Sequence, residues 1–245
     1  MIWTFAASSV VVAAATLRVL PAGSGSVNRG YLATLRSIPG LYRRHATLRT
    51  AASRGTLWFF AFCVVWSGLP VALSEPPFSY SADRIGFFAL AGLSGILATQ
   101  VAGVLVDRLG ARVVILCSLM TAGLSATAVA WRLDSTATTM ACLAVFDAGL
   151  FAAQVANQSE VLAIDPAAPA RFNSAYMVVY FVGGSLGTAV GALAAELVGW
   201  PATALLAAAA ITLAGLVTLS TAAAPAAAGP TALRDRELVP ANLGR

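Results

Sequence analysis

The chain has 245 residues, of which 59% are hydrophobic and only 10% charged, and its mean hydropathy is +0.82. Soluble domains carry roughly 25% charged residues, so a soluble fold of this length could not bury so much apolar surface, and a bilayer is the expected solvent. The net charge of +5 comes from 15 basic residues, all arginine. Because they lie at the edges of apolar blocks, they indicate membrane topology rather than nucleic-acid binding.

Seven apolar stretches are long enough, or nearly so, to span a bilayer as helices. They cover residues 2–20, 56–74, 85–106, 113–131, 136–158, 172–195 and 197–219. The predicted fold is therefore an all-α polytopic bundle of about seven transmembrane helices. The first stretch, residues 2–20, is predicted to be a transmembrane helix rather than a signal peptide, because no positive charge precedes its apolar core and Arg18 follows it.

Residues 21–55 form the longest interruption between apolar stretches. They carry several arginines, and no acidic residue precedes Glu75. We interpret them as a basic cytoplasmic loop, with a surface helix around residues 31–49, that anchors the topology; binding of lipid or a regulatory partner is the alternative. The last segment, residues 221–245, is rich in Ala, Pro and Gly and is predicted to be a disordered cytoplasmic tail.

The arginines also predict the orientation of the chain. With residues 21–55 in the cytoplasm, thirteen of the fifteen arginines lie on the cytoplasmic side, and only Arg84 and Arg132 lie outside. The positive-inside rule then places the N-terminus outside and the C-terminus in the cytoplasm. The Arg- and Ala-rich composition suggests a bacterial source, so the expected location is the inner (plasma) membrane of a bacterium.

A charged turn separates the third and fourth apolar stretches. It contains Gly103, Asp107, Arg108, Gly110 and Arg112. Gly103 would allow two helices to approach closely, Asp107 could pair with Arg108 or Arg112, and Gly110 would permit a sharp reversal. Such a turn could hold two helical bundles in one conformation and release them in another; the alternative is a generic arginine-rich hairpin.

These five residues match the G-x-x-x-D-R-x-G-x-R signature of the major facilitator superfamily, and the chain resembles the C-terminal half of such a transporter. In that family a copy of the motif follows the eighth helix, after a long central loop and the seventh helix. The resemblance identifies residues 2–20 with helix six, residues 21–55 with the central loop and residues 56–220 with a six-helix C-terminal bundle. The segment from Asp165 to Asn173 resembles drug-efflux-like members more loosely.

A typical family member has about twelve helices in two halves, with the substrate between them. The resemblance therefore implies that five helices are missing and that the chain is truncated. A missing N-terminal half would then be its partner, together with the lipid bilayer, a small-molecule substrate and protons.

The fifth stretch contains Asp147, an ionisable residue near the middle of an apolar segment, where an ionised carboxylate is costly. At 100° per residue, Gln154 and Gln158 each lie within about 20° of Asp147, whereas Asn157 is about 80° away. Such a stripe faces protein or water rather than lipid. Asp147, Gln154 and Gln158 are candidates for binding substrate or protons; the alternative is a hydrogen-bonded cluster that only orients helices.

Other candidate residues lie in the second and sixth stretches. Gly183, Gly187 and Gly191 repeat the small-xxx-small spacing of closely packed transmembrane helices. Tyr176 and Tyr180 lie on a neighbouring part of that face and are candidates for lining a substrate cavity.

In the second stretch, Trp66 precedes Pro70, which can kink or hinge a helix. Trp66 is a further substrate-binding candidate.

Several other activities are disfavoured. Retinal proteins need a lysine, and the chain has none; a serine protease needs a base, and His45 in the basic loop is the sole histidine. There is no ATP-binding P-loop, and the three cysteines lack metal-ligand spacing. The residues thus predict no enzyme activity, cofactor or metal site. The resemblance implies secondary active transport, with proton-coupled efflux of a small organic molecule; the alternative is a non-transporting remnant or scaffold.

Overall fold

The computed structural model describes residues 2–19 and 31–221. The chain divides into two compact units between residues 39 and 40. The first contains α1 (Ile2–Val19) and most of α2 (Tyr31–Arg44). The predicted tail, apart from residue 221, and part of the predicted basic loop lie outside the described residues.

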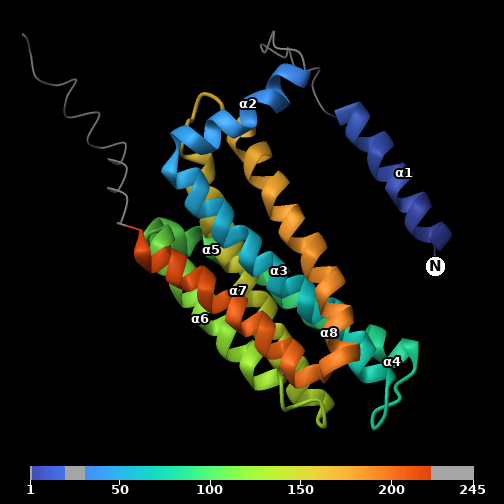
Figure 1. Ribbon diagram of the computed structural model, residues 1–245. Helices are drawn as coiled ribbons and strands as arrows, with labels where there is room; N and C mark the ends of the chain where they lie inside the picture. The colour runs from blue at the N-terminus through green and yellow to red at the C-terminus, as the bar shows by residue number, and fades with distance from the viewer. Residues whose placement is uncertain (1, 20–30, 222–245) are drawn as a thin grey trace, which may run out of the picture. The chain divides into compact units, whose positions relative to one another are not determined.

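The second unit is a bundle of helices, and no strand occurs in the described part of the chain (Figure 1). Its elements are α3 (Ala46–Ser74), α4 (Ala82–Phe87), the 3₁₀ helix η1 (Phe88–Gly92), α5 (Leu93–Leu109), α6 (Ala111–Val129), α7 (Thr136–Leu162) and α8 (Pro169–Ser220). Within residues 2–19 and 31–221, five helices are long and apolar enough to cross a membrane. The all-α polytopic fold class is confirmed.

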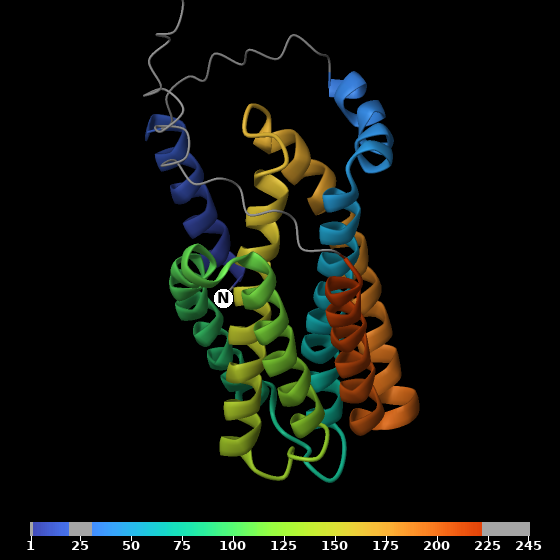
Figure 2. The ribbon, with the colours of Figure 1, turned by 90° about the vertical axis from the view of Figure 1, so that its left-hand side faces the viewer.

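The longest helix, α8, consists of two arms joined at a reversal. Gly199 has φ 79° and ψ 171°, a conformation that L side chains rarely adopt, and Pro201 follows it. The chain turns back there, so that residues 200–220 run in the opposite direction to residues 169–198 (Figure 1, Figure 2). We call these the first and second arms of α8. They correspond to the sixth and seventh predicted spans, so the five candidate helices contain six of the predicted spans.

The helix boundaries differ from the predicted ones at α3. This helix begins at Ala46, so residues 46–55 are helical rather than part of a loop. Alanine favours helix, and Leu48, Ala51 and Ala52 are buried against the rest of the bundle. The predicted span begins only at residue 56, because Arg49 and Arg54 lower the mean hydropathy of the residues before it. The helix itself begins ten residues earlier, at Ala46.

The span predicted for residues 85–106 is also interrupted. It consists of α4, η1 and α5, which together cover Ala82–Leu109. Tighter 3₁₀ geometry within a longer helix often marks a hinge.

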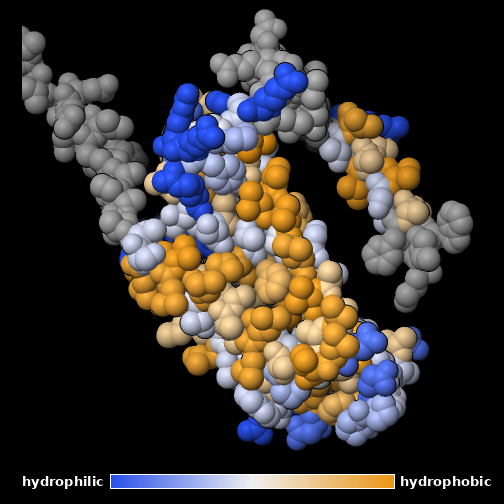
Figure 3. Space-filling view, in the orientation of Figure 1, coloured by the Kyte–Doolittle hydropathy of each residue, from blue (hydrophilic) through white to orange (hydrophobic). Residues whose placement is uncertain are grey.

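The bundle is built around contacts of α3 and α7. Helix α3 packs along α8, whereas α7 packs against α5 and α6. The outward surface is apolar over much of its area (Figure 3), with exposed side chains such as Leu97, Leu124 and Phe181. Exposed leucines and phenylalanines in this number are expected of helices that face lipid tails.

Helix α1, in the first unit, has 18 residues, and its side chains from Ala6 to Arg18 are exposed. The helix matches the first predicted apolar stretch. Its crossing of the membrane stays a prediction.

Candidate functional site

Asp147 of α7 lies in the interior of the bundle, with 1% of its surface exposed. Its carboxylate accepts a hydrogen bond from the indole N–H of Trp66 on α3, at 3.0 Å between Nε1 and Oδ1. On the other side it faces η1, since a Cβ placed on Gly92 would lie 3.5 Å from Oδ2. Two residues that sequence reasoning selected separately, Asp147 and Trp66, are therefore in direct contact, at a point where three elements meet.

The other residues of the predicted polar stripe do not join Asp147. Gln154 accepts a hydrogen bond from the hydroxyl of Tyr176 on α8, at 2.7 Å. The amide of Gln158 donates to Oδ1 of Asn173, also on α8, at 2.7 Å. Gln154 lies seven residues, about 10 Å, along the helix from Asp147. The stripe therefore makes contacts with two different helices rather than forming one site.

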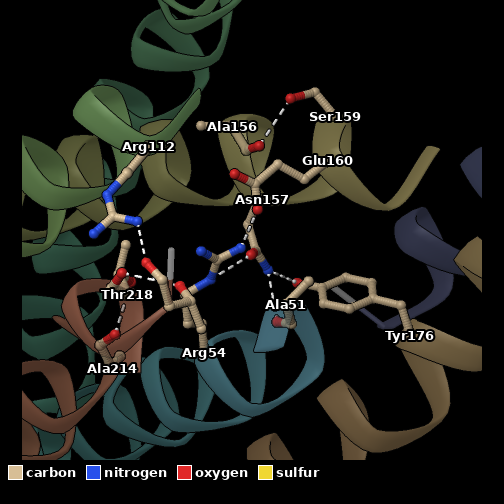
Figure 4. Close-up of polar contacts among 11 residues, drawn as sticks. Ala51, Arg54, Arg112, Ala156, Asn157, Ser159, Glu160, Tyr176, Ala214 and Thr218 are labelled. Carbon is tan, nitrogen blue, oxygen red and sulfur yellow. Dashed lines mark hydrogen bonds and ion pairs between the residues drawn. The ribbon is translucent and has the colours of Figure 1, made fainter. Parts of the chain in front are cut away.

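A second polar cluster contains residues that the sequence analysis missed (Figure 4). Arg54 of α3 is only 3% exposed, forms an ion pair with Glu160 of α7, and donates from Nε to Oδ1 of Asn157 at 2.9 Å. The Asn157 amide donates to the carbonyl of Ala51 at 2.9 Å and to the Tyr176 hydroxyl at 3.2 Å. We call Arg54, Gln154, Asn157, Glu160 and Tyr176 the Arg54 network.

The Arg54 network joins α3, α7 and the first arm of α8 through side chains. A buried arginine must be paired, because removing its charge from water is expensive. Here the carboxylate of Glu160 and the amide oxygen of Asn157 supply the partners. The cluster can therefore hold these three helices in one arrangement, and it changes only if a charge-assisted bond breaks.

The signal that could have revealed the network was the alanine-rich continuation of α3. Once residues 46–55 are read as helix, Arg54 falls on a buried helix and needs an acidic partner. Glu160 is the acidic residue near the corresponding end of α7. Asn157 lies about 80° from the Asp147 stripe on the helix, and that angle turns it toward α3 and α8.

Tyr180 lies among aromatic rings rather than in a polar site. It is 8% exposed and stacks on Phe59 of α3, with ring centroids 4.0 Å apart and an interplanar angle of 7°. The ring of Trp58 meets that of Tyr180 edge-on, with centroids 5.1 Å apart, and the centroid of the Tyr176 ring lies 5.6 Å from that of Tyr180. Stacking of this kind fixes the contact between α3 and α8.

The three candidate packing glycines lie where the first arm of α8 crosses α3. A Cβ on Gly183, Gly187 or Gly191 would overlap a backbone carbonyl oxygen of α3. Those oxygens belong to Thr56, Phe60 and Val64 respectively. The glycine row therefore brings the two helix backbones into contact, as the small-xxx-small spacing predicts.

The charged turn that contains Asp107, Arg108, Gly110 and Arg112 connects α5 to α6. Gly110, with φ 82° and ψ 148°, ends one helix and begins the next. Arg112 donates to the carbonyl of Leu219 at 3.2 Å and to that of Thr221, at the end of the second arm of α8. Asp107 and Arg108 are exposed, and neither forms an ion pair with another described residue. The expected pairing of Asp107 with Arg108 or Arg112 is thus not present.

Gly103 does not bring helices together in this structure. A Cβ on Gly103 would meet no atom within 4 Å in the described chain. The predicted close approach at this glycine is therefore absent.

Arg112 neutralises the negative end of a helix, and replacing it should loosen that end. We expect Arg112→Gln to speed amide hydrogen exchange in the last turn of α8 about two- to five-fold, because a cation at a helix C-terminus contributes about 0.3–1 kcal/mol. Hydrogen exchange followed by mass spectrometry would measure it. Arg108→Gln, which removes an exposed charge from the same turn, is the matched control; equal exchange in both variants would contradict the prediction.

No metal centre is evident: the described residues contain no group of three or more His, Cys, Asp or Glu side chains that could hold an ion.

A comparison with known protein families finds no family model that matches the chain. Individual proteins do match. The chain is 33% identical over 193 residues to "Probable transporter SCO4007" of Streptomyces coelicolor, covering 78% of this chain and 45% of that protein. It is 30% identical over 198 residues to "Uncharacterized transporter YgaY" of Escherichia coli O157:H7, covering 81% of this chain and 50% of that protein. The chain thus spans about half the length of these relatives, which are named as transporters.

Proposed function

We propose that this chain forms the C-terminal half of a secondary active transporter of the major facilitator superfamily, which exports a small organic molecule in exchange for protons. The observation that carries the proposal is the similarity to transporter-named proteins about twice as long. The signature turn and the order of basic loop, spans and turn support the choice of family and half. Alternating access then moves two halves about a site near the middle of the membrane.

Asp147 is the residue that we assign to proton exchange. It is a buried carboxyl group in a membrane-spanning helix, and such groups mark proton and substrate pathways. When ionised, it accepts a charge-assisted hydrogen bond from Trp66; protonation removes the charge and weakens that bond. Since Trp66 belongs to α3, loading the proton changes the contact of α7 with that helix.

The proposed role of Asp147 predicts a separation of proton coupling from substrate exchange. In the full-length transporter that contains this chain, Asp147→Asn should abolish accumulation driven by a pH gradient, because asparagine cannot release a proton. Exchange of labelled for unlabelled substrate should continue. The measurement uses proteoliposomes and a fluorescent organic compound that the unmodified protein exports.

The matched control is Asp134→Asn, at an exposed carboxylate in the turn before α7. It should leave both activities unchanged. Gradient-driven accumulation at the normal rate in Asp147→Asn would remove this residue from the coupling mechanism.

The chain alone should not transport, because the substrate site of this family lies between two halves. Saturable, proton-dependent flux through liposomes containing only this chain would contradict the half-transporter assignment. Absence of flux from the full-length protein across a broad panel of organic compounds would instead favour the scaffold or remnant reading.

A further inference from the structure

An apolar groove of about 380 Å³ lies where α3 meets both arms of α8. Its lining includes Leu57 and Phe60 of α3, Leu186 of the first arm, and Leu206 and Leu213 of the second arm. These are side chains of membrane-spanning segments. The one hydroxyl in the lining, on Thr56, donates to the carbonyl of Val179 at 3.2 Å. The groove therefore suits a hydrocarbon chain rather than a polar ligand.

The same face of α3 leads from the groove to a fixed positive charge. Arg49, Ser53, Thr56 and Phe60 follow one another at intervals of four, three and four residues, which places them on one stripe of the helix. Arg49 and Ser53 are exposed, and Thr56 and Phe60 are half-buried. Arg49 lies about 10 Å along the helix axis from Thr56. A charged site therefore stands at the end of the groove that points out of the membrane.

The guanidinium of Arg49 is held in place by the end of α2. Its Nη1 donates to the carbonyls of Tyr42 at 2.8 Å and Arg43 at 3.2 Å. The Tyr42 hydroxyl in turn donates to the carbonyl of Ala175 on α8 at 2.8 Å. Burial raises the pKa of Tyr42 to about 12, so this donor keeps its proton at neutral pH. Because a guanidinium carries five N–H donors, Arg49 retains donors for an outside acceptor.

The surroundings of Arg49 favour an anion. Arg43 and Arg44 are exposed beside it, at the end of α2, and the carboxylate of Glu160, which reaches α3 five residues further along, is paired with Arg54. Figure 3 shows hydrophilic side chains at this end of the bundle, next to the apolar surface of α3 and α8. Basic sites between transmembrane helices attract the head groups of anionic lipids.

We propose that this surface binds one anionic phospholipid, with the phosphate on Arg49 and an acyl chain in the groove between α3 and α8. A phospholipid carries its phosphate at the membrane interface and its acyl chains directly beneath, which is the order of Arg49 and the groove along α3. Gly183 lines the groove and packs closely on Thr56, since a Cβ there would lie 2.5 Å from the Thr56 carbonyl oxygen. The proposal does not rest on the proposed transport function, because lipid retention is measured without substrate or flux.

Native mass spectrometry of the full chain in detergent tests the site, with phosphatidylglycerol and phosphatidylcholine as the probes. The unmodified chain should retain one phosphatidylglycerol molecule and bind phosphatidylcholine more weakly. Arg49→Gln should weaken phosphatidylglycerol binding about five-fold, the effect of one basic residue near an anionic surface. Ala209→Phe, which places a ring in the groove at an exposed lining position, should remove the retained molecule of either lipid.

Two controls separate this site from general effects of charge and size. Arg132→Gln removes an exposed arginine at the other end of the bundle, and Ala128→Phe enlarges an exposed alanine of α6 outside the groove. Both should bind lipid as the unmodified chain does. Unchanged phosphatidylglycerol retention in Arg49→Gln and Ala209→Phe would overturn the proposal, as would equal retention of the two lipids by the unmodified chain.

Discussion

Replacing Glu160 by glutamine should destabilise the bundle by about 3–5 kcal/mol, the usual cost of removing one partner from a buried ion pair. Arg54 is 3% exposed, so its charge would remain in the interior with only neutral amide oxygens, those of Asn157 and the introduced glutamine, as partners. Arg54→Met should cost less, because the carboxylate left behind is 26% exposed and can reach water. Unfolding curves of the chain in detergent micelles would measure both.

The double variant Arg54→Met with Glu160→Gln tests whether the charges act as a pair. With both charges gone, no buried ion remains, so the double variant should be more stable than Glu160→Gln alone. If the two single losses simply add, the residues are not coupled and the ion pair does not stabilise this arrangement. Glu196→Gln, at an exposed carboxylate near the end of the first arm of α8, is the control and should change stability by less than about 0.5 kcal/mol.

Replacing Gly187 by alanine should also disrupt the bundle, by about 1–3 kcal/mol or more. The added Cβ would overlap the backbone carbonyl of Phe60, and a backbone carbonyl of a neighbouring helix cannot move aside as a flexible side chain can. The two helices would have to separate along the whole glycine row. Thermal unfolding in detergent measures the loss, and reduced stacking of Tyr180 on Phe59 would appear in near-ultraviolet circular dichroism.

Gly215 provides the matched control, since it lies in the second arm of α8 and a Cβ there would meet no atom within 4 Å in the described chain. Gly215→Ala should leave stability unchanged or raise it by up to about 1 kcal/mol, because alanine favours helix. A Gly187→Ala variant as stable as Gly215→Ala would show that the contact between α8 and α3 tolerates separation.

Much of the fold was predictable because apolar length has a direct physical meaning in a bilayer. The apolar blocks became helices, and Gly199 divides α8 three residues after the turn predicted near Glu196. The boundary of α3 was not predictable from hydropathy. Arg49 and Arg54 interrupt the apolar block, yet Arg49 is exposed and bonded to backbone carbonyls, whereas Arg54 is buried and paired.

The candidate site was predictable residue by residue but not as an arrangement. Asp147 and Trp66 were each notable in the sequence, as a carboxyl group and a large aromatic in apolar segments. Helical periodicity grouped Asp147 with Gln154 and Gln158, because it reports which residues share a face. It does not report which neighbouring helix each part of that face meets, and in the structure Asp147 meets α3 whereas the two glutamines meet α8.

The sequence by itself determined that this is an all-helical membrane protein, since no other solvent accommodates its apolar surface, and it located the sharp turn at Gly110. Only the tertiary structure decided that Arg54 is an interior residue, that Asn157 belongs to its network, and that Arg49 stands above an apolar groove. The reason is that a charge is tolerated in a bundle according to its partners. Those partners, Glu160 for Arg54 and the end of α2 for Arg49, come from segments whose proximity depends on how the helices pack.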